Sequence, residues 1–182
     1  MTRIVAGDAG GRSLLVPPGS GTRPTTERAR EGLFNTVATL LDLTGARVLD
    51  LFAGSGAVGL EALSRGAAHA LLVEADARAA KVIRTNARTL ELNAQVVPAK
   101  VERVLAAAPD EPYDLAFLDP PYALGDAELD RIVSTVETWL GKDGVIVVER
   151  DRRSRSPQWP DGIEAVKSRR YGDSTLWYGR RS

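Results

Sequence analysis

The chain has 182 residues, 43% of them hydrophobic and 26% charged, with a formal net charge of zero and no cysteine. This composition fits one globular domain, and it excludes disulfides, thiol nucleophiles and zinc–thiolate sites. The one histidine, His69, has no serine or carboxylate pattern near it, so we expect no metal site. No apolar run approaches the ~20 residues of a membrane span, and the first residues lack the apolar core of a signal peptide. We therefore expect a cytoplasmic protein.

The amino-terminal segment is predicted to be a β-hairpin followed by a linker. Residues 3–6 and 13–16 are strand-like and flank a glycine-rich turn. The linker is the Pro-Pro-Gly-Ser-Gly segment at residues 17–21. We therefore divide the chain into a hairpin extension at residues 1–21 and a single domain at residues 22–182.

The domain is predicted to have an α/β fold. It begins with a helix that is capped by Thr25 or Thr26 and buries Ala29, Leu33, Val37 and Leu41. Strands are then expected at residues 47–51, 70–74, 95–98, 113–119 and 145–149, with helices between them that include two capped by Asp76 and Asp126. Strands separated by helices imply a parallel sheet with right-handed crossovers. Two further strands, at 165–170 and 175–178, have no helix between them and add an antiparallel hairpin, which makes seven strands in a Rossmann-like sheet.

The first candidate site is a glycine-rich loop after the strand at residues 47–51. Gly54, Gly56 and Gly59 match a dinucleotide-binding fingerprint, and Glu74 ends the next strand, where an acid contacts ribose hydroxyls. An NAD-dependent oxidoreductase therefore stays open. Asp50 favours a different ligand, because a carboxylate at the strand tip repels pyrophosphate and suits a cation such as the amino group of a methionine moiety.

The second candidate site is the Asp119-Pro-Pro-Tyr122 segment at the end of the strand at residues 113–119. Two prolines stop the strand and leave carbonyls free to accept hydrogen bonds. The Asp119 carboxylate and the Pro120 carbonyl are suited to hold both hydrogens of an amino group on a flat base. Tyr122 would stack on a flipped base. A proline-stiffened loop with a surface tyrosine is the simpler alternative.

Basic residues gather at both ends of the neutral chain. Residues 1–30 carry five arginines against two acids, and residues 150–182 carry nine basic residues against four acids. Nucleic-acid backbones respond to such local patches, although solvated surface charge is an equally simple explanation. The candidate phosphate contacts are Arg3, Arg12, Arg23, Lys167, Arg169 and Arg170. Arg28 and Arg30 would face a cofactor carboxylate or brace their helix.

On these residues the chain resembles the class I S-adenosylmethionine-dependent methyltransferases, and within them the RsmD family. The closer resemblance rests on Arg3-Ile-Val-Ala-Gly7 with Gly11-Arg12, Arg23-Pro-Thr25, Arg28-Ala-Arg30-Glu31, Leu33-Phe-Asn35, Asp50-Leu-Phe-Ala-Gly-Ser-Gly56, Glu74, Asp119-Pro-Pro-Tyr122 and Tyr171-Gly172. It implies transfer of a methyl group to guanine N2 of 16S ribosomal RNA, at guanine 966, in free RNA or the small ribosomal subunit.

The resemblance also implies a set of site residues. The cofactor S-adenosylmethionine would be held by Asp50, Gly54, Ser55, Gly56, Glu74 and Ala75, and the catalytic residues would be Asp119, Pro120 and Tyr122. The hairpin extension would contact RNA, and we expect a monomer. One departure concerns Lys100, which stands where such enzymes often have an acid that contacts adenine, so adenine would be held by backbone or apolar groups.

Three other functions remain open at this point. The Asp119-Pro-Pro-Tyr122 segment suits a DNA methyltransferase that acts on adenine N6 or cytosine N4, although the chain has no separate recognition domain. The glycine loop alone suits an NAD-dependent oxidoreductase. A non-catalytic RNA-binding module would explain the basic ends without any methyl transfer.

Overall fold

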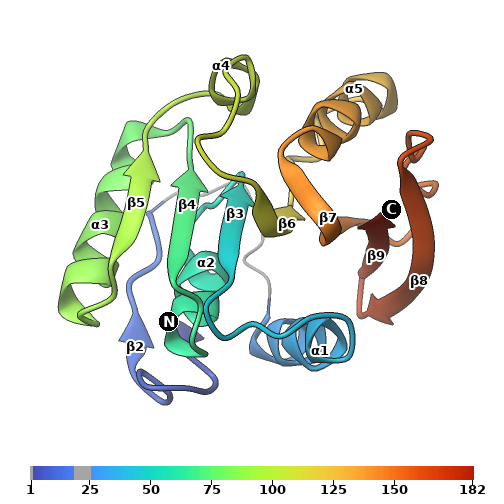
Figure 1. The fold of residues 1–182 in the computed structure, drawn as a ribbon. Helices are drawn as coiled ribbons and strands as arrows, with labels where there is room; N and C mark the ends of the chain where they lie inside the picture. Colours follow the sequence, from blue (N-terminus) through green and yellow to red (C-terminus); the bar gives the residue numbers. More distant parts are fainter. Residues whose placement is uncertain (1, 19–25) are drawn as a thin grey trace.

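The computed structural model describes residues 2–18 and 26–182, which form a seven-stranded sheet, a small amino-terminal hairpin and helices on both sheet faces (Figure 1). The helices are α1 (Glu27–Ala38), α2 (Ala57–Ser64), α3 (Ala77–Thr89), α4 (Val101–Leu105) and α5 (Asp126–Glu137). The strands are β1 (Thr2–Arg3), β2 (Ser13–Leu14), β3 (Arg47–Leu51), β4 (His69–Val73), β5 (Ala94–Val97), β6 (Tyr113–Leu118), β7 (Leu140–Asp151), β8 (Ile163–Tyr171) and β9 (Ser174–Arg181).

The sheet has the order β5-β4-β3-β6-β7-β9-β8. The first five strands are parallel, whereas β9 pairs antiparallel with both β7 and β8. This confirms the predicted Rossmann-like fold, with its seven mostly parallel strands and its hairpin at the carboxyl end. The strand order reverses between β3 and β6, and ligands of open α/β sheets bind at the carboxyl ends of strands at such a point.

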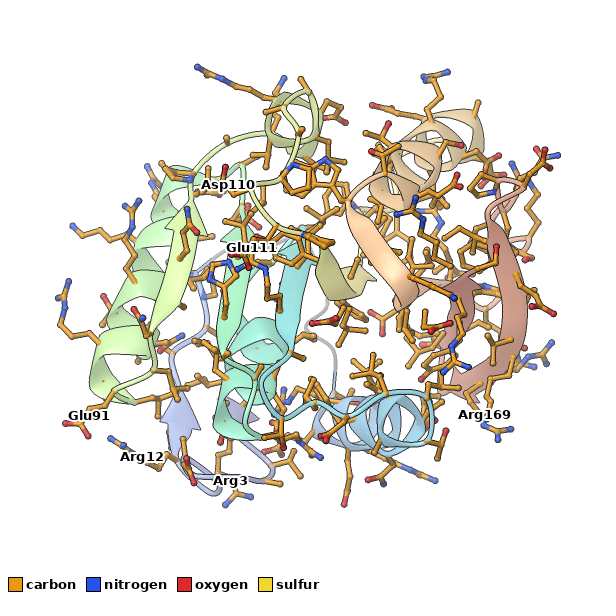
Figure 2. All side chains as sticks on the ribbon, in the orientation of Figure 1. Arg3, Arg12, Glu91, Asp110, Glu111 and Arg169 are labelled. Carbon is orange, nitrogen blue, oxygen red and sulfur yellow. The ribbon has the colours of Figure 1, made fainter. Side chains whose placement is uncertain are left out.

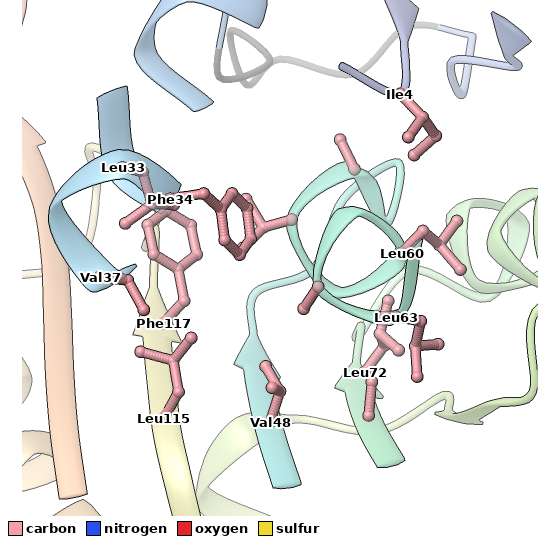
Figure 3. Close-up of a cluster of buried hydrophobic side chains, with 14 of the residues drawn as sticks. Ile4, Leu33, Phe34, Val37, Val48, Leu60, Leu63, Leu72, Leu115 and Phe117 are labelled. Atoms are coloured by element: carbon pink, nitrogen blue, oxygen red, sulfur yellow. The ribbon is translucent and has the colours of Figure 1, made fainter. Parts of the chain in front are cut away.

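Alternate residues of the central strands pack on opposite faces of the sheet, because successive side chains of a strand point to opposite sides. On one face, Val48, Leu72 and Phe117 pack with α1, α2 and α3, and Figure 3 shows this cluster under the first two helices. On the other face, Leu49 and Ile146 pack with α4 and α5. Both faces of the parallel strands are therefore covered.

The amino-terminal hairpin is shorter than predicted. Only Thr2–Arg3 and Ser13–Leu14 pair, whereas four residues were expected in each strand. Ile4 still donates across the hairpin to the Arg12 carbonyl at 2.9 Å, but the Val5 and Ala6 N–H groups donate instead to the Glu61 carboxylate at 2.8 and 3.0 Å. The hairpin is thus fixed to α2 by a side chain, and its Ile4 and Leu14 lie fully buried in the main core.

The predicted helix caps hold at two positions and fail at one. Thr26 caps α1 by accepting from the Ala29 N–H, and Asp76 caps α3 by accepting from two backbone N–H groups. Asp126 was expected to cap α5, but Gly125 is the N-cap and Asp126 is the first helical residue. Its carboxylate lies 3.6 Å from the Arg150 guanidinium and 3.5 Å from that of Arg155, so ion pairing has replaced capping.

Helix α1 also ends earlier than its apolar pattern indicated. It stops at Ala38, and Leu41, expected on the buried face, lies half-buried in the following loop. Within the residues that the structure describes, no helix has the length and apolar character needed to cross a bilayer.

Candidate functional site

A tight loop joins the end of β3 to the start of α2. Phe52 and Gly54 both have φ of 59°, and Gly56, the N-cap of α2, has φ of 82°. Glycine is needed at Gly56 because an added Cβ would also lie 2.9 Å from Ile83 Cγ2. At Gly54 an added Cβ would meet no atom within 4 Å, so the loop presents bare backbone to open space.

Asp50 lies beneath this loop with almost no exposure to solvent. Its Oδ2 accepts a hydrogen bond from the Gly59 N–H at 2.9 Å. Burial raises the pKa of Asp50 to about 8; the Gly59 hydrogen bond lowers it and the charge of Glu74 adds to the rise. A carboxylate this poorly solvated gains from a cation beside it, because an opposite charge favours the ionised form.

Glu74 follows β4 and holds the loop from the other side. Its Oε1 accepts from the Gly54 N–H and its Oε2 accepts from the Asp76 N–H, both at 2.8 Å. The carboxylate therefore ties the glycine loop to the start of α3. Each oxygen has a further lone pair with which to accept from a ligand hydroxyl.

These residues surround a cavity of about 370 Å³, which we call the glycine-loop cavity. The predicted cofactor residues that line it are Asp50, Gly54, Ser55, Glu74 and Ala75, whereas Gly56 lies outside its wall. Lys100, Val101 and Glu102 form part of the wall, so the first acid that follows β5 is Glu102 and not residue 100. A volume of this size suits a small organic ligand.

The hairpin extension supplies the opposite wall through residues 16–18. Asn86 of α3 holds this segment, since its amide accepts from the Leu15 N–H at 2.8 Å and donates to the Leu15 carbonyl at 3.0 Å. The same amide donates to the Ser55 carbonyl at 3.3 Å. One buried side chain therefore joins the extension to the glycine loop.

A second cavity, of about 450 Å³, lies beside the tip of β6, and we call it the proline-tip cavity. Its wall includes all three predicted catalytic residues, Asp119, Pro120 and Tyr122. Tyr122 is 63% exposed, so its ring is free to stack on a ligand. Asp119 and Pro121 line both cavities, which places the two side by side at the switch point of the sheet.

Asp119 has an acidic neighbour that the sequence analysis missed. Leu118 pairs with Val148, so Asp119, which directly follows β6, lies next to Glu149 near the carboxyl end of β7, and a side-chain hydrogen bond joins them. Burial raises the pKa of Asp119 well above its usual value, and the charge of Glu149 and the hydrogen bond to it raise it further. The sequence shows that the strand predicted at residues 145–149 ends in an acid. It does not show how this strand is aligned with β6, and that alignment is what brings Glu149 to Asp119.

A family model described as "Conserved hypothetical protein 95" matches residues 2–180 of the chain. Ribosomal RNA small subunit methyltransferase D of Escherichia coli (strain K12) is 41% identical over 161 residues, which cover 87% of this chain and 79% of that protein. The chain belongs to the RsmD family. The resemblance expected from the sequence is thereby confirmed.

Two further relatives cover nearly the whole chain. The YlbH protein of Bacillus subtilis (strain 168) is 39% identical over 176 residues, covering 93% of this chain and 94% of its own. The solved structure of the Escherichia coli protein yhhF has a TM-score of 0.87 and 35% identity, covering 100% of this chain and 98% of that one. The fold of this RsmD-family chain is therefore shared over its full length.

The predicted phosphate contacts of this RsmD-family chain fall into separate groups. Arg3 and Arg12 project from the hairpin extension, and Arg169 projects from β8 at the other side of the view (Figure 2). Arg170 lines the proline-tip cavity, together with Arg28 from α1. Of the other two, Lys167 is half-buried on β8, and Arg23 lies outside the described residues.

Arg30, the other arginine of the α1 motif, braces its helix. Its guanidinium is fully buried and pairs with the Glu61 carboxylate at 3.0 Å, so it faces neither cavity. The one histidine, His69, contacts the Tyr113 hydroxyl, with Nε2 at 3.1 Å. Among the described residues there is no group of three or more histidine, cysteine, aspartate or glutamate side chains placed to hold a metal.

Proposed function

We propose that this chain transfers a methyl group from S-adenosylmethionine to N2 of a guanine in 16S ribosomal RNA, with guanine 966 as the nucleotide that the family resemblance suggests. The observation that carries the proposal is the common wall of the two cavities. Asp119 and Pro121 line both, so a ligand in the glycine-loop cavity and a base in the proline-tip cavity would meet there.

The glycine-loop cavity fits S-adenosylmethionine by its chemistry. Burial leaves the Asp50 carboxylate poorly solvated, and the amino group of the methionine moiety is a cation that would stabilise its charge. The open space at Gly54 lets a ligand approach the backbone, and Glu74 has acceptor capacity for ribose hydroxyls. When bound, the cofactor supplies a methyl group on a positively charged sulfur.

The proline-tip cavity would hold the base. We expect Asp119 and the Pro120 carbonyl to accept hydrogen bonds from its amino group, whose lone pair is otherwise delocalised into the ring. Tyr122 would stack on the base and set its plane. The transfer would form an N–C bond and break the bond between the methyl group and sulfur, so that S-adenosylhomocysteine leaves. The amine would lose one proton, which Asp119 or water takes. Proximity and orientation would supply most of the rate enhancement.

Ribosomal RNA is the proposed substrate because a relative 41% identical to this chain carries the name ribosomal RNA small subunit methyltransferase D. Two basic residues of the proline-tip cavity, Arg28 and Arg170, support a phosphate-rich partner because they line its wall. Arg3, Arg12, Arg23, Lys167 and Arg169 are the further contacts that we propose, with the extension at residues 1–21 as the RNA-contacting part. We further propose that the enzyme acts in the cytoplasm as a monomer.

Two measurements test the function. Calorimetry should show binding of S-adenosylhomocysteine and none of NADH. Tritium transfer from labelled S-adenosylmethionine should mark small-subunit RNA or particles but not DNA, and mass spectrometry of RNA from a strain lacking the gene should map the missing methyl group to a guanine. Labelling of DNA alone, or of no nucleic acid, would reject the proposal.

A further inference from the structure

The proline-tip cavity has two adjacent carboxyl groups on its wall. Asp119 directly follows β6, Glu149 lies near the carboxyl end of the neighbouring parallel strand β7, and both line the cavity. Glu149 is only 6% exposed, and a glutamate is rarely this buried unless it is paired with another group. The proposed transfer gives a role to Asp119 but none to Glu149.

The hydrogen bond between the two carboxyls determines what they can offer a ligand. Such a bond needs one proton, which lies between the two groups. That proton is engaged within the pair, so the remaining carboxyl oxygens are hydrogen-bond acceptors. The pair therefore matches a ligand edge that presents two donors next to each other.

Among the bases with an exocyclic amino group, guanine has such an edge. Its N1–H and its 2-amino group are adjacent donors. Adenine and cytosine place their amino group beside an unprotonated ring nitrogen, which is an acceptor. A flipped base is identified by hydrogen bonds to this edge. An acceptor that faces a buried carboxyl oxygen is left unpaired, and unpaired buried polar groups are costly.

We propose that Glu149 selects guanine by accepting a hydrogen bond from its N1–H while Asp119 accepts from the 2-amino group. This inference rests on the proposed methyl transfer and concerns the same cavity. In this inference Asp119 contacts the reacting amine and Glu149 recognises the base. The Asp119-Pro-Pro-Tyr122 segment alone would also accept adenine or cytosine, and the contact at Glu149 would exclude them.

The test replaces the N1–H donor of the substrate base by an acceptor, in a base that also lacks the 6-oxo group of guanine. The RNA is small-subunit RNA assembled by ligation with 2-aminopurine at the mapped nucleotide. This base keeps the 2-amino group, but its N1 carries no hydrogen and is an acceptor. We expect the unaltered enzyme to methylate 2-aminopurine with a kcat/KM at least about tenfold below that for guanine, because a hydrogen bond to a charged group is lost. Equal rates on the two bases would overturn the inference without affecting the proposed transfer.

The protein side is tested with Glu149→Gln, whose amide can donate to the bare N1 of 2-aminopurine. We expect this variant to lose at least about tenfold on guanine and to narrow or reverse the preference over 2-aminopurine. Binding of S-adenosylhomocysteine should be unchanged, because Glu149 does not line the glycine-loop cavity. If Glu149→Gln still binds S-adenosylhomocysteine but keeps the wild-type preference for guanine over 2-aminopurine, Glu149 does not contact N1.

Asp151→Asn is the matched control for the loss of charge. Asp151 also lines the proline-tip cavity, but its Oδ1 accepts from the Arg153 N–H at 2.8 Å. We expect this variant to keep the wild-type ratio of guanine to 2-aminopurine. A shift as large as that of Glu149→Gln would mean that the charge of the cavity, and not a contact at Glu149, sets the preference.

Discussion

Arg30 and Glu61 form an ion pair in which neither side chain is exposed, with Nε of the arginine 3.0 Å from Oε1 of the glutamate. The same carboxylate accepts from Arg65 at 2.8 Å and from two backbone N–H groups of the hairpin extension. Arg30 in turn donates to the Arg3 carbonyl. The buried charges therefore join α1, α2 and the extension.

Glu61→Gln should destabilise the protein strongly. It leaves the buried Arg30 guanidinium without its counter-charge, and breaking a buried pair in this way costs roughly 3–5 kcal/mol. Urea unfolding measures the loss. Glu31→Gln, an exposed acid on α1, is the control and should change the free energy of unfolding by less than about 0.5 kcal/mol. Equal effects of the two substitutions would show that the buried pair does not stabilise the fold.

Asp50→Asn should weaken binding of S-adenosylmethionine by at least about tenfold, because a charged contact becomes a neutral one. The unaltered protein should also release a proton when the cofactor binds near pH 7. The pKa of Asp50, raised to about 8 by burial, leaves it mostly protonated before a cation arrives. Calorimetry in two buffers of different ionisation enthalpy measures both effects. No proton release from the unaltered protein would rule out Asp50 as the partner of the cation.

Asp50 should also affect the pH dependence of stability. Its pKa is about 8 in the folded protein against 3.8 as the ordinary value, so the folded state binds more protons between these limits. The free energy of unfolding should therefore fall as the pH rises from 5 to 8. The raised pKa of Asp119 acts in the same direction. Asp50→Asn should give a flatter profile in denaturant titrations at several pH values, and parallel profiles would disprove the contribution.

Asn86→Ala should loosen the extension from the glycine loop. It removes the hydrogen bonds to Leu15 and the Ser55 carbonyl, with an expected loss of about 1–3 kcal/mol in unfolding free energy. Binding of S-adenosylhomocysteine should also weaken, since residues 16–18 line the glycine-loop cavity, in which we propose that it binds. Hydrogen exchange at the Leu15 amide should become faster. Asn93→Ala, at an exposed position, should alter none of these measurements.

Asp119→Ala should retain S-adenosylhomocysteine binding and lose methyl transfer by a factor on the order of 10²–10⁴. Single-turnover tritium transfer measures the rate, and calorimetry measures binding. Asp110→Ala, an exposed acid before the amino end of β6, should behave as the unaltered enzyme does. If the variant bound the cofactor weakly but the remaining complex turned over normally, Asp119 would contact the cofactor and not the reacting amine.

Patterns within short segments predicted much of this structure. The strand at Arg47–Leu51 was predicted with its observed bounds, because its buried apolar run is followed by a glycine loop. The Asp119-Pro-Pro-Tyr122 tip was predicted because prolines must end the strand. The helix start at Thr26 and the cap at Asp76 follow from the same kind of local chemistry.

The contacts that the sequence analysis missed depend on pairing between distant segments. Glu149 meets Asp119 only through the register of β7 against β6. Glu61 and Asn86 look like ordinary polar positions of helices, and their roles require the hairpin extension to lie over them. The hairpin strands were predicted too long because these side chains take the backbone groups that a longer ladder would have used.

The hydrogen bonds from Glu61 and Asn86 to the extension have a consequence for protein engineering. A chimera that exchanges residues 1–18 between two relatives would also need compatible residues at positions 61 and 86, which lie in separate helices of the recipient. Domain boundaries drawn along the chain alone would therefore yield grafts that fold poorly, whereas grafts that include both helical anchors should remain intact.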